Sequence, residues 1–428
     1  MKNQMKDSGI EWVGDIPTSW SCKPIRALFE ENRKKNIFGK ETNALQFRFG
    51  TIVPKQNFDA EEDSYVAETI RKYNIVDEGM IVLNGLNLNF DFVTQRVAIV
   101  RERGIITSAY MSFSVKDENQ VLPDYANLLL KSYDSCAALH NMGGGVRKIL
   151  NFDELKHCQF VLPPITVQHK IVDFLYNKCG EIDGLISDIQ SEIDTLEQYK
   201  RSVISEAVTK GLNPNVEVKQ DKIEWIDAIP AHWQQLKGKY LFVQRNEKGN
   251  KIELQLLSPT QSYGVIPQSK YEELSGMSAV KLNEGTNFTL LKTIHKGDYC
   301  ISLRSFQGGF EYSTYEGVVS PAYQVFYPMV EICDGYYKYL FKEKSFIAVI
   351  NSFTLSLRDG KNIAFDDFGN TFIPYPPIGE QRAIAEFLDE KCAEIDGCIV
   401  DKQSQIDTLE SYKKSIIFEY VTGKKEVI

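Results

Sequence analysis

Cysteine and histidine have the side chains with the widest chemistry in this sequence, as nucleophiles, bases and metal ligands. The eight cysteines are far apart, with no Cys-x-x-Cys pair and no Cys/His set at the spacing of a zinc site. We therefore expect idle or buried thiols in a reducing cytoplasm and no metal site. The five histidines have no partner at metal or triad spacing, so we expect them to be surface residues or satisfied core residues.

Motifs of nucleotide and base chemistry are also missing from the sequence. It contains no Gly-x-x-x-x-Gly-Lys-Ser/Thr phosphate loop, no Gly-x-Gly-x-x-Gly after a strand, and neither Asn-Pro-Pro-Tyr nor Asp-Pro-Pro-Tyr, with which amino-methyltransferases hold a flipped base. Glu217-Val218-Lys219 is similar to the end of a nuclease motif but lies in a linker. We predict no catalytic residues in this chain. It also has no apolar stretch long enough to span a membrane and no visible signal peptide.

The elements that would position functional residues are duplicated, and the numbering of the two copies differs by a constant offset of 213. Ile10-Glu11-Trp12 recurs as Ile223-Glu224-Trp225, and Pro163-Pro164-Ile165 recurs as Pro376-Pro377-Ile378. The second block continues in the same register through Gln168/Gln381, Glu181/Glu394 and Tyr199/Tyr412. Chance does not keep such a register over so long a block, so we infer a tandem duplication.

Each repeated block predicts a long helix with a heptad seam, in which apolar residues alternate at spacings of three and four. A Pro-Pro pair precedes each helix and a glycine, Gly211 or Gly423, follows it. We expect the two seams to pair as an antiparallel coiled coil, with two lysines helping to set the register. The seam residues are Ile182, Ile186, Ile189, Ile193, Leu196, Lys200 and Val203 in the first copy, and Ile395, Ile399, Ile406, Leu409, Lys413 and Ile416 in the second.

Two stretches of low mutual identity, roughly 21–160 and 234–373, separate the repeated blocks. Short β-rich runs such as 80–83, 97–100 and 299–303 predict α+β domains, and Ala109-Tyr110 matches Ala322-Tyr323 at the same offset. We therefore expect one fold with diverged surfaces. The net charge is −9, of which residues 161–220 and 376–428 carry −7, so the globular stretches are nearly neutral.

The chain resembles the specificity subunit of type I restriction–modification systems. The resemblance is carried by residues 9–20 with their echo at 223–233, and by the Pro-Pro-Ile-x-x-Gln elements at 163–168 and 376–381. The second element, with Glu380, fits the family pattern best, whereas Val167 departs from it.

This resemblance implies an α+β protein with a pseudo-two-fold internal repeat, in which two antiparallel coiled-coil helices separate two target-recognition domains. We expect a first target-recognition domain at 1–160, a central helical region at 161–212, a second target-recognition domain at 213–373 and a distal helical region at 374–428. The helices would act as a ruler: residues 182–208 span about 40 Å, close to the roughly 34–36 Å between half-sites on one side of B-DNA.

The same resemblance implies partners and a function. The chain would recognise a split, asymmetric sequence in double-stranded DNA and dock two methylase subunits, which bring S-adenosylmethionine and methylate adenine at N6. Restriction subunits would add translocation and cleavage with ATP and Mg²⁺. We expect no cofactor in this chain itself.

Residues that read DNA are expected in glycine-containing loops rich in amides and cations, because Asn, Gln, Arg and Lys read base edges and bind phosphates. Two such loops are predicted per domain, one after a strand and one before a Phe-Asp pair that the two copies share, Phe152-Asp153 and Phe365-Asp366. The candidates are Asn84, Asn87, Asn89, Arg147 and Lys148 in the first domain, and Arg304, Gln307, Arg358 and Lys361 in the second.

Two other functions remain open from the residues alone. The chain could be a scaffold that carries two ligand-binding modules on a coiled coil without binding DNA. It could also be a methyltransferase or nuclease of unfamiliar type. A lack of salt-sensitive DNA binding in the assembled complex would favour the scaffold, and turnover of S-adenosylmethionine by the isolated chain would support an enzyme.

Overall fold

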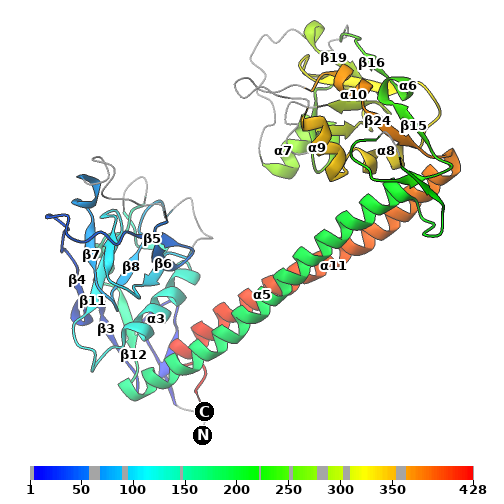
Figure 1. Cartoon of the computed structure of the whole chain (residues 1–428). Helices are drawn as coiled ribbons and strands as arrows, with labels where there is room; N and C mark the ends of the chain where they lie inside the picture. Colours follow the sequence, from blue (N-terminus) through cyan, green and yellow to red (C-terminus); the bar gives the residue numbers. More distant parts are fainter. Residues whose placement is uncertain are drawn as a thin grey trace. The chain divides into compact units, whose positions relative to one another are not determined.

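The structure is a computed structural model that describes residues 4–56, 68–88, 95–144, 148–220, 223–249, 254–276, 288–301, 309–352 and 363–427. The chain divides into two compact units, 1–190 with 403–428 (unit 1) and 191–402 (unit 2). Each unit combines one globular region with parts of both long helices (Figure 1).

Unit 1 is built around a four-stranded antiparallel sheet in the order β4-β11-β8-β9. Its strands are β4 (Phe29–Glu31), β11 (Met111–Val115), β8 (Ile81–Leu83) and β9 (Val97–Ile99). Antiparallel pairs surround it: β1 (Met5–Asp7) with β2 (Asp15–Pro17), β3 (Ser21–Pro24) with β12 (Gln159–Leu162), β5 (Leu45–Arg48) with β6 (Thr51–Pro54), and β7 (Asn74–Val76) with β10 (Gly104–Ile106). The helices are α1 (Ile25–Leu28), α3 (Pro123–Ser135), the 3-10 turn η1 (Leu139–Asn141) and α4 (Phe152–Leu155).

Unit 2 repeats this sheet in the order β16-β23-β20-β21. Its strands are β16 (Phe242–Arg245), β23 (Gln324–Pro328), β20 (Tyr299–Ile301) and β21 (Phe310–Tyr312). The surrounding pairs are β13 (Val218–Lys219) with β14 (Ile229–Pro230), β15 (Gln234–Lys237) with β24 (Phe372–Tyr375), β17 (Leu257–Thr260) with β18 (Gly264–Pro267), and β19 (Lys292–Ile294) with β22 (Gly317–Val319). The helices are α6 (Gly238–Leu241), α7 (Gln268–Ser275), η2 (Phe288–Leu290), α8 (Asp334–Leu340), α9 (Lys344–Ser352) and α10 (Phe365–Asn370).

The predicted α+β class and the prediction of one fold in two diverged copies are confirmed by the matching sheet orders. The three β-rich runs form β8, β9 and β20, and the Ala-Tyr landmarks precede the equivalent strands β11 and β23. These strands are short apolar segments whose side chains are almost entirely buried, as in β8 and β20. The sequence identity between the copies is low because only the buried pattern has to be kept.

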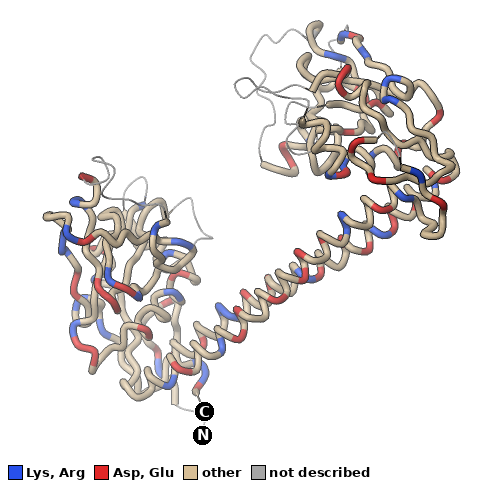
Figure 2. Tube along the Cα trace, in the orientation of Figure 1, with Lys and Arg blue, Asp and Glu red and all other residues tan. Residues whose placement is uncertain are grey.

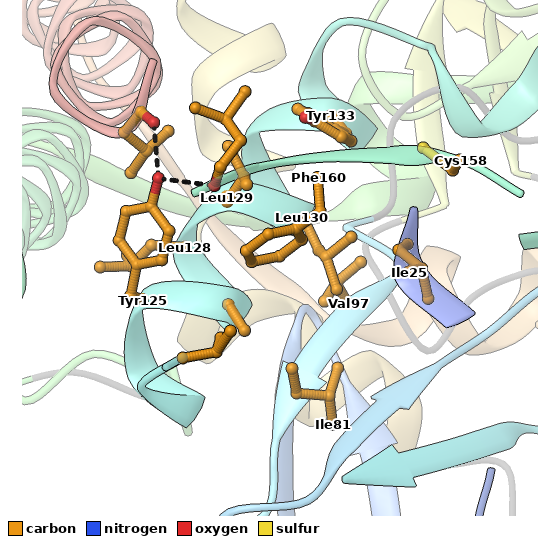
Figure 3. Close-up of a cluster of buried hydrophobic side chains, with 14 of the residues drawn as sticks. Ile25, Ile81, Val97, Tyr125, Leu128, Leu129, Leu130, Tyr133, Cys158 and Phe160 are labelled. Atoms are coloured by element: carbon orange, nitrogen blue, oxygen red, sulfur yellow. Dashed lines mark hydrogen bonds between the residues drawn. The ribbon is translucent and has the colours of Figure 1, made fainter. Parts of the chain in front are cut away.

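A tyrosine links the core of each unit to the last turn of a long helix. In unit 1 the Tyr125 hydroxyl, on α3, donates to the carbonyl of Val421 at 2.9 Å and to that of Val161 at 3.2 Å (Figure 3). In unit 2 the Tyr336 hydroxyl donates to the carbonyl of Val208 at 2.7 Å. Both side chains are fully buried, so these bonds satisfy polar groups that water does not reach. Each globular region is thereby bound to the end of one helix and packed against the start of the other.

The two long helices are α5 (Ile165–Lys210) and α11 (Ile378–Val421). Each begins directly after its Pro-Pro pair and ends just before a glycine with positive φ, Gly211 at 76° or Gly423 at 74°. Proline suits a helix start, and glycine takes up the left-handed conformation that ends it. Both boundaries were predicted from the sequence and are confirmed.

Within each unit the helices pack side by side and antiparallel. In unit 1 the Phe174 ring packs at a tilt against Tyr420, with 4.5 Å between ring centroids, while Asp183, further along α5, pairs with Lys413, earlier on α11. Acidic and basic residues are interspersed along both helices (Figure 2). This outer face agrees with the charged positions expected around a heptad seam.

Candidate nucleic-acid interface

The two loops of unit 1 that were predicted to read DNA lie next to each other. The backbone N–H of Leu88 donates to the carbonyl of Lys148 at 3.1 Å, and that of Leu150 donates to the carbonyl of Gly85 at 2.9 Å. A Cβ on Gly85 would lie only 2.1 Å from the Leu150 carbonyl oxygen, so this close approach requires glycine. Segments 84–88 and 148–150 therefore form one surface.

The candidate side chains on this surface differ in exposure and in hydrogen bonding. Asn84 is half-buried, and its amide oxygen accepts a hydrogen bond from the N–H of Leu86 at 3.2 Å. Asn87 and Lys148 are exposed and both have positive φ, 53° and 36°. Positive φ is uncommon for residues other than glycine, so both positions have an unusual backbone conformation. Asn89 and Arg147 lie outside the described residues.

Arg96 is a residue of this region that the sequence reasoning missed. Its guanidinium group is buried and donates to the carbonyls of Leu86 at 2.7 Å, Asn84 at 3.2 Å and Asn87 at 3.4 Å. Its backbone N–H donates to the Asp134 carboxylate at 2.6 Å. A fork of donors on three carbonyls fixes the course of residues 84–87, which have no regular secondary structure. A lone arginine just before an apolar strand gave no pattern that would have singled it out.

The corresponding candidates of unit 2, Arg304, Gln307, Arg358 and Lys361, lie outside the described residues. The strand register nevertheless shows where the two units differ. The first loop joins the paired strand ends Leu83 and Val97 in unit 1, and Ile301 and Phe310 in unit 2. Residues 84–96 therefore connect the two strands in unit 1 and only residues 302–309 connect them in unit 2, and Gly309 stands where Arg96 stands in unit 1.

The seam residues lie on the less exposed side of each long helix. Ile182, Ile193, Ile395, Ile406 and Ile416 are buried, and the other predicted seam positions are half-buried. The half-buried seam residues are Ile186, Ile189, Leu196, Lys200, Val203, Ile399, Leu409 and Lys413.

Both seam lysines pair with an acid on the other helix. Lys200 lies 2.6 Å from Asp396 in unit 2, and Lys413 lies 2.6 Å from Asp183 in unit 1. Lys402, at the second-copy position of Ile189, pairs with Glu192.

The repeated Pro-Pro-Ile-x-x-Gln element places a buried glutamine at the start of each long helix. The Gln168 amide oxygen accepts from the N–H of Leu122 at 2.9 Å, and its amide nitrogen donates to the carbonyls of Gln120 and Pro163 at 2.8 and 3.0 Å. Gln381 does the same with Cys333 and Pro376, each at 2.8 Å. These residues tie the helix starts to the globular regions.

The glutamate that only the second copy of this element carries has its own contacts. Glu380 accepts from the Trp233 ring N–H at 2.9 Å and lies 2.6 Å from His232, both in the repeated segment that begins unit 2's globular region. Val167 replaces it in the first copy, where a valine side chain cannot accept a hydrogen bond. This departure from the family pattern therefore removes a polar link between helix and domain.

The described residues contain no group of three or more His, Cys, Asp or Glu side chains placed to hold a metal ion. All eight cysteines are free thiols, and burial raises the pKa of Cys158 to about 12. Within the same described ranges, no helix has both the length and the apolar character of a membrane span.

Comparison with known proteins agrees with this architecture. The family "Type I restriction modification DNA specificity domain" matches residues 32–195 and 235–397. The chain is 23% identical over 431 residues to the putative type I restriction enzyme MjaX specificity subunit of Methanocaldococcus jannaschii, covering 97% of this chain and 96% of that protein. It is 26% identical over 352 residues to the MjaVIII specificity subunit of the same organism, covering 76% and 75%.

A solved structure, reported for the complex assembly and conformational transition of the type I R–M system, has the same fold with a TM-score of 0.68. It is 13% identical and covers 96% of this chain and 99% of that chain. The family matches more than half of the chain in two copies, each ending within a long helix. The protein therefore belongs to the type I restriction–modification specificity family and is a DNA specificity subunit, a non-catalytic component of such a system.

Proposed function

We propose that this subunit reads a two-part asymmetric DNA sequence, with one half-site for each unit. The observation that carries the proposal is that the two units share one sheet order but differ in the length of the connection between the last two strands of that order, residues 84–96 against 302–309. A common scaffold with different loops suits two different half-sites, because base edges are read by side chains on such loops.

The proposed DNA contacts in unit 1 are Asn87 and Lys148, which are exposed on the joined surface, together with Asn84, Asn89 and Arg147. In unit 2 they are Arg304, Gln307, Arg358 and Lys361. Amides and the guanidinium groups suit base edges, whereas the lysines suit phosphates. Arg96 supports the unit 1 loop from inside without facing the DNA.

The repeated parts are proposed to bind two identical methylase subunits. Tyr199 and Tyr412, equivalent residues on α5 and α11, are exposed to 49% and 47%, and identical exposed positions suit identical partners.

S-adenosylmethionine for N6-adenine methylation would be bound by these partners, and ATP with Mg²⁺ by restriction subunits. Because the substrate would be cellular DNA, we place the complex in the cytoplasm.

The first experiment is to co-express the chain with the methylase encoded beside it and to map N6-methyladenine across the genome. A split motif of two short blocks around a fixed spacer would support the proposal and name the target. An active methylase without a new motif would contradict it and favour a scaffold that does not read DNA.

A second experiment addresses the helices as a ruler between the half-sites. Inserting one heptad into both α5 and α11 keeps the seam in phase while lengthening the pair by about 10 Å. We expect the methylated motif to require a longer spacer or methylation to stop. An unchanged spacer would show that the helix length does not set it.

A further inference from the structure

An exposed phenylalanine occupies the tip of the β5–β6 hairpin. Arg48 pairs with Thr51, which leaves Phe49 and Gly50 as a two-residue turn, and both have positive φ, 48° and 72°. Such a turn is usually made by Asn-Gly, and positive φ is strained for a bulky residue. Yet the Phe49 side chain is 78% exposed. A strained, exposed aromatic residue contributes little to folding, so its ring needs another explanation.

The tip lies beside the candidate DNA-reading loop of unit 1. A Cβ on Gly50 would lie 2.5 Å from the side-chain oxygen of Gln95, so the turn is packed directly on that residue. Gln95 precedes Arg96, whose guanidinium group holds the carbonyls of loop 84–87. The Arg48 guanidinium carbon lies 5.9 Å from the centroid of the Phe49 ring and adds a cation at the same tip.

Unit 2 places an aromatic residue at the equivalent tip with a different sequence. Tyr263 is 50% exposed and is the last residue of the turn between β17 and β18; Gly264, the first residue of β18, follows it with a φ of 70°. A Cβ on Gly264 would lie 2.8 Å from the carbonyl oxygen of Tyr312 in β21, the strand that follows loop 302–309. Tyr263 also lines a cavity of about 290 Å³ with Lys338, Lys342 and Glu311, of which Lys342 and Glu311 form an ion pair.

We propose that Phe49 and Tyr263 are aromatic wedges, each of which inserts its ring against a base step of the half-site that its unit reads. This inference rests on the proposed DNA-reading function. Apolar side chains inserted between base steps partly unstack them, and aromatic rings stack on bases of any sequence. The neighbouring cations, such as Arg48, suit the phosphates on either side of the step. Each wedge would add to the affinity for DNA and would favour base steps that unstack easily. Both effects would come in addition to the base contacts that the loops make.

The test uses the full chain assembled with its methylase, and duplexes that carry the methylated motif with 2-aminopurine at successive positions. Phe49→Asn is the informative variant, because Asn-Gly is the preferred sequence for this turn and keeps the hairpin folded. We expect binding to weaken roughly 5- to 150-fold, which is the loss for one stacked aromatic ring. The increase in 2-aminopurine fluorescence seen with the wild-type complex should disappear at one half-site.

Tyr263→Ala should abolish the fluorescence change at the other half-site, so each variant serves as a control for its counterpart. Phe38→Ala is the matched surface control: Phe38 is 81% exposed, in a turn whose Gly39 lies near Arg71. Its complex should bind like the wild type.

Three results would overturn the wedge: Phe49→Asn binding as tightly as the wild type, weaker binding without any loss of the fluorescence change, or an equal loss in Phe38→Ala. All three presuppose a wild-type complex that binds its motif. A wild-type complex that binds no duplex specifically would instead contradict the proposed function itself.

Discussion

The Lys200 ammonium group lies 2.6 Å from the Asp396 carboxylate, between the two long helices of unit 2. Lys413 and Asp183 repeat the pair in unit 1 at the same distance, and each residue matches its equivalent at the constant offset of the duplication. A charged residue at a seam position reduces apolar burial but disfavours other registers, because a shifted helix would leave it without its partner. The duplication has therefore kept both members of the pair that specifies how the helices align.

Charge reversal tests this role. Lys200→Glu should lower the free energy of unfolding by roughly 0.5–1 kcal/mol, since the pair is partly exposed and surface ion pairs are weak. Adding Asp396→Lys should restore most of the loss. Circular dichroism during thermal unfolding measures both, with Lys413→Glu as the equivalent in unit 1. Strictly additive losses in the double variant would show that the two residues do not interact.

The buried glutamine at each helix start should matter more for stability. Gln168→Leu removes three hydrogen bonds from a fully buried side chain. The carbonyl of Pro163 then loses its partner in a buried site, and the N–H of Leu122 and the carbonyl of Gln120 lose theirs in partly buried ones. We expect a loss of about 2–4 kcal/mol, measured by denaturant unfolding. The adjacent, exposed His169→Leu is the control and should change stability little. Equal effects of the two substitutions would refute a structural role for the amide.

Arg96 should act on DNA binding only through the loop that it supports. Arg96→Lys keeps the charge but loses the fork of donors, so specific binding should weaken at least tenfold with an unchanged dependence on salt. Lys148→Ala is the comparison. If the exposed Lys148 binds a phosphate, its loss should reduce the slope of log K against log salt by about 0.9. A similar change of slope in Arg96→Lys would mean that Arg96 itself contacts DNA.

Glu311 in β21 predicts a pH dependence of stability. Burial raises its pKa from 4.5 to about 7, although Lys342 beside it acts in the opposite direction. The folded state therefore binds the proton more tightly than the unfolded state. This contribution to stability is complete below about pH 4.5 and is lost as the pH rises to about 7, by up to about 3 kcal/mol.

The matched variant for this titration is Glu311→Gln, which keeps the size of the side chain without its titration. The difference in unfolding free energy between wild type and variant should change across pH 4.5–7 and stay constant above it. A difference that is independent of pH in that window would contradict the raised pKa.

The elements were predictable from the sequence wherever local pattern decides structure. Helix boundaries follow from Pro163-Pro164 and Gly211, because proline and glycine restrict or free the backbone at their own positions. The side of each helix that packs follows from the spacing of residues such as Ile182 and Ile193. The duplication is visible because the same offset returns after each variable stretch.

That constant offset conceals two length changes that only the structure resolves. Strand β8 begins at Ile81 and its equivalent β20 at Tyr299, whereas β9 begins at Val97 and its equivalent β21 at Phe310. The starts of β8 and β20 differ by more than the offset of the duplication, whereas the starts of β9 and β21 differ by the same number as that offset. Unit 2 is therefore longer before β20 and shorter in the loop that follows it. Sequence identity between the two copies is low in these stretches, so the change in length is not visible in the sequence. The strand pairing locates it.

The duplication, the long helices with their seams and the α+β class were determined by the sequence alone, because periodicity and turn residues act over a few neighbouring positions. Tertiary structure decided which distant residues meet. Arg96 supports loop 84–87, Gln168 satisfies Leu122, and Lys200 finds Asp396 on the other long helix. Such partners depend on how separate elements pack, and no local spacing in the chain encodes that packing.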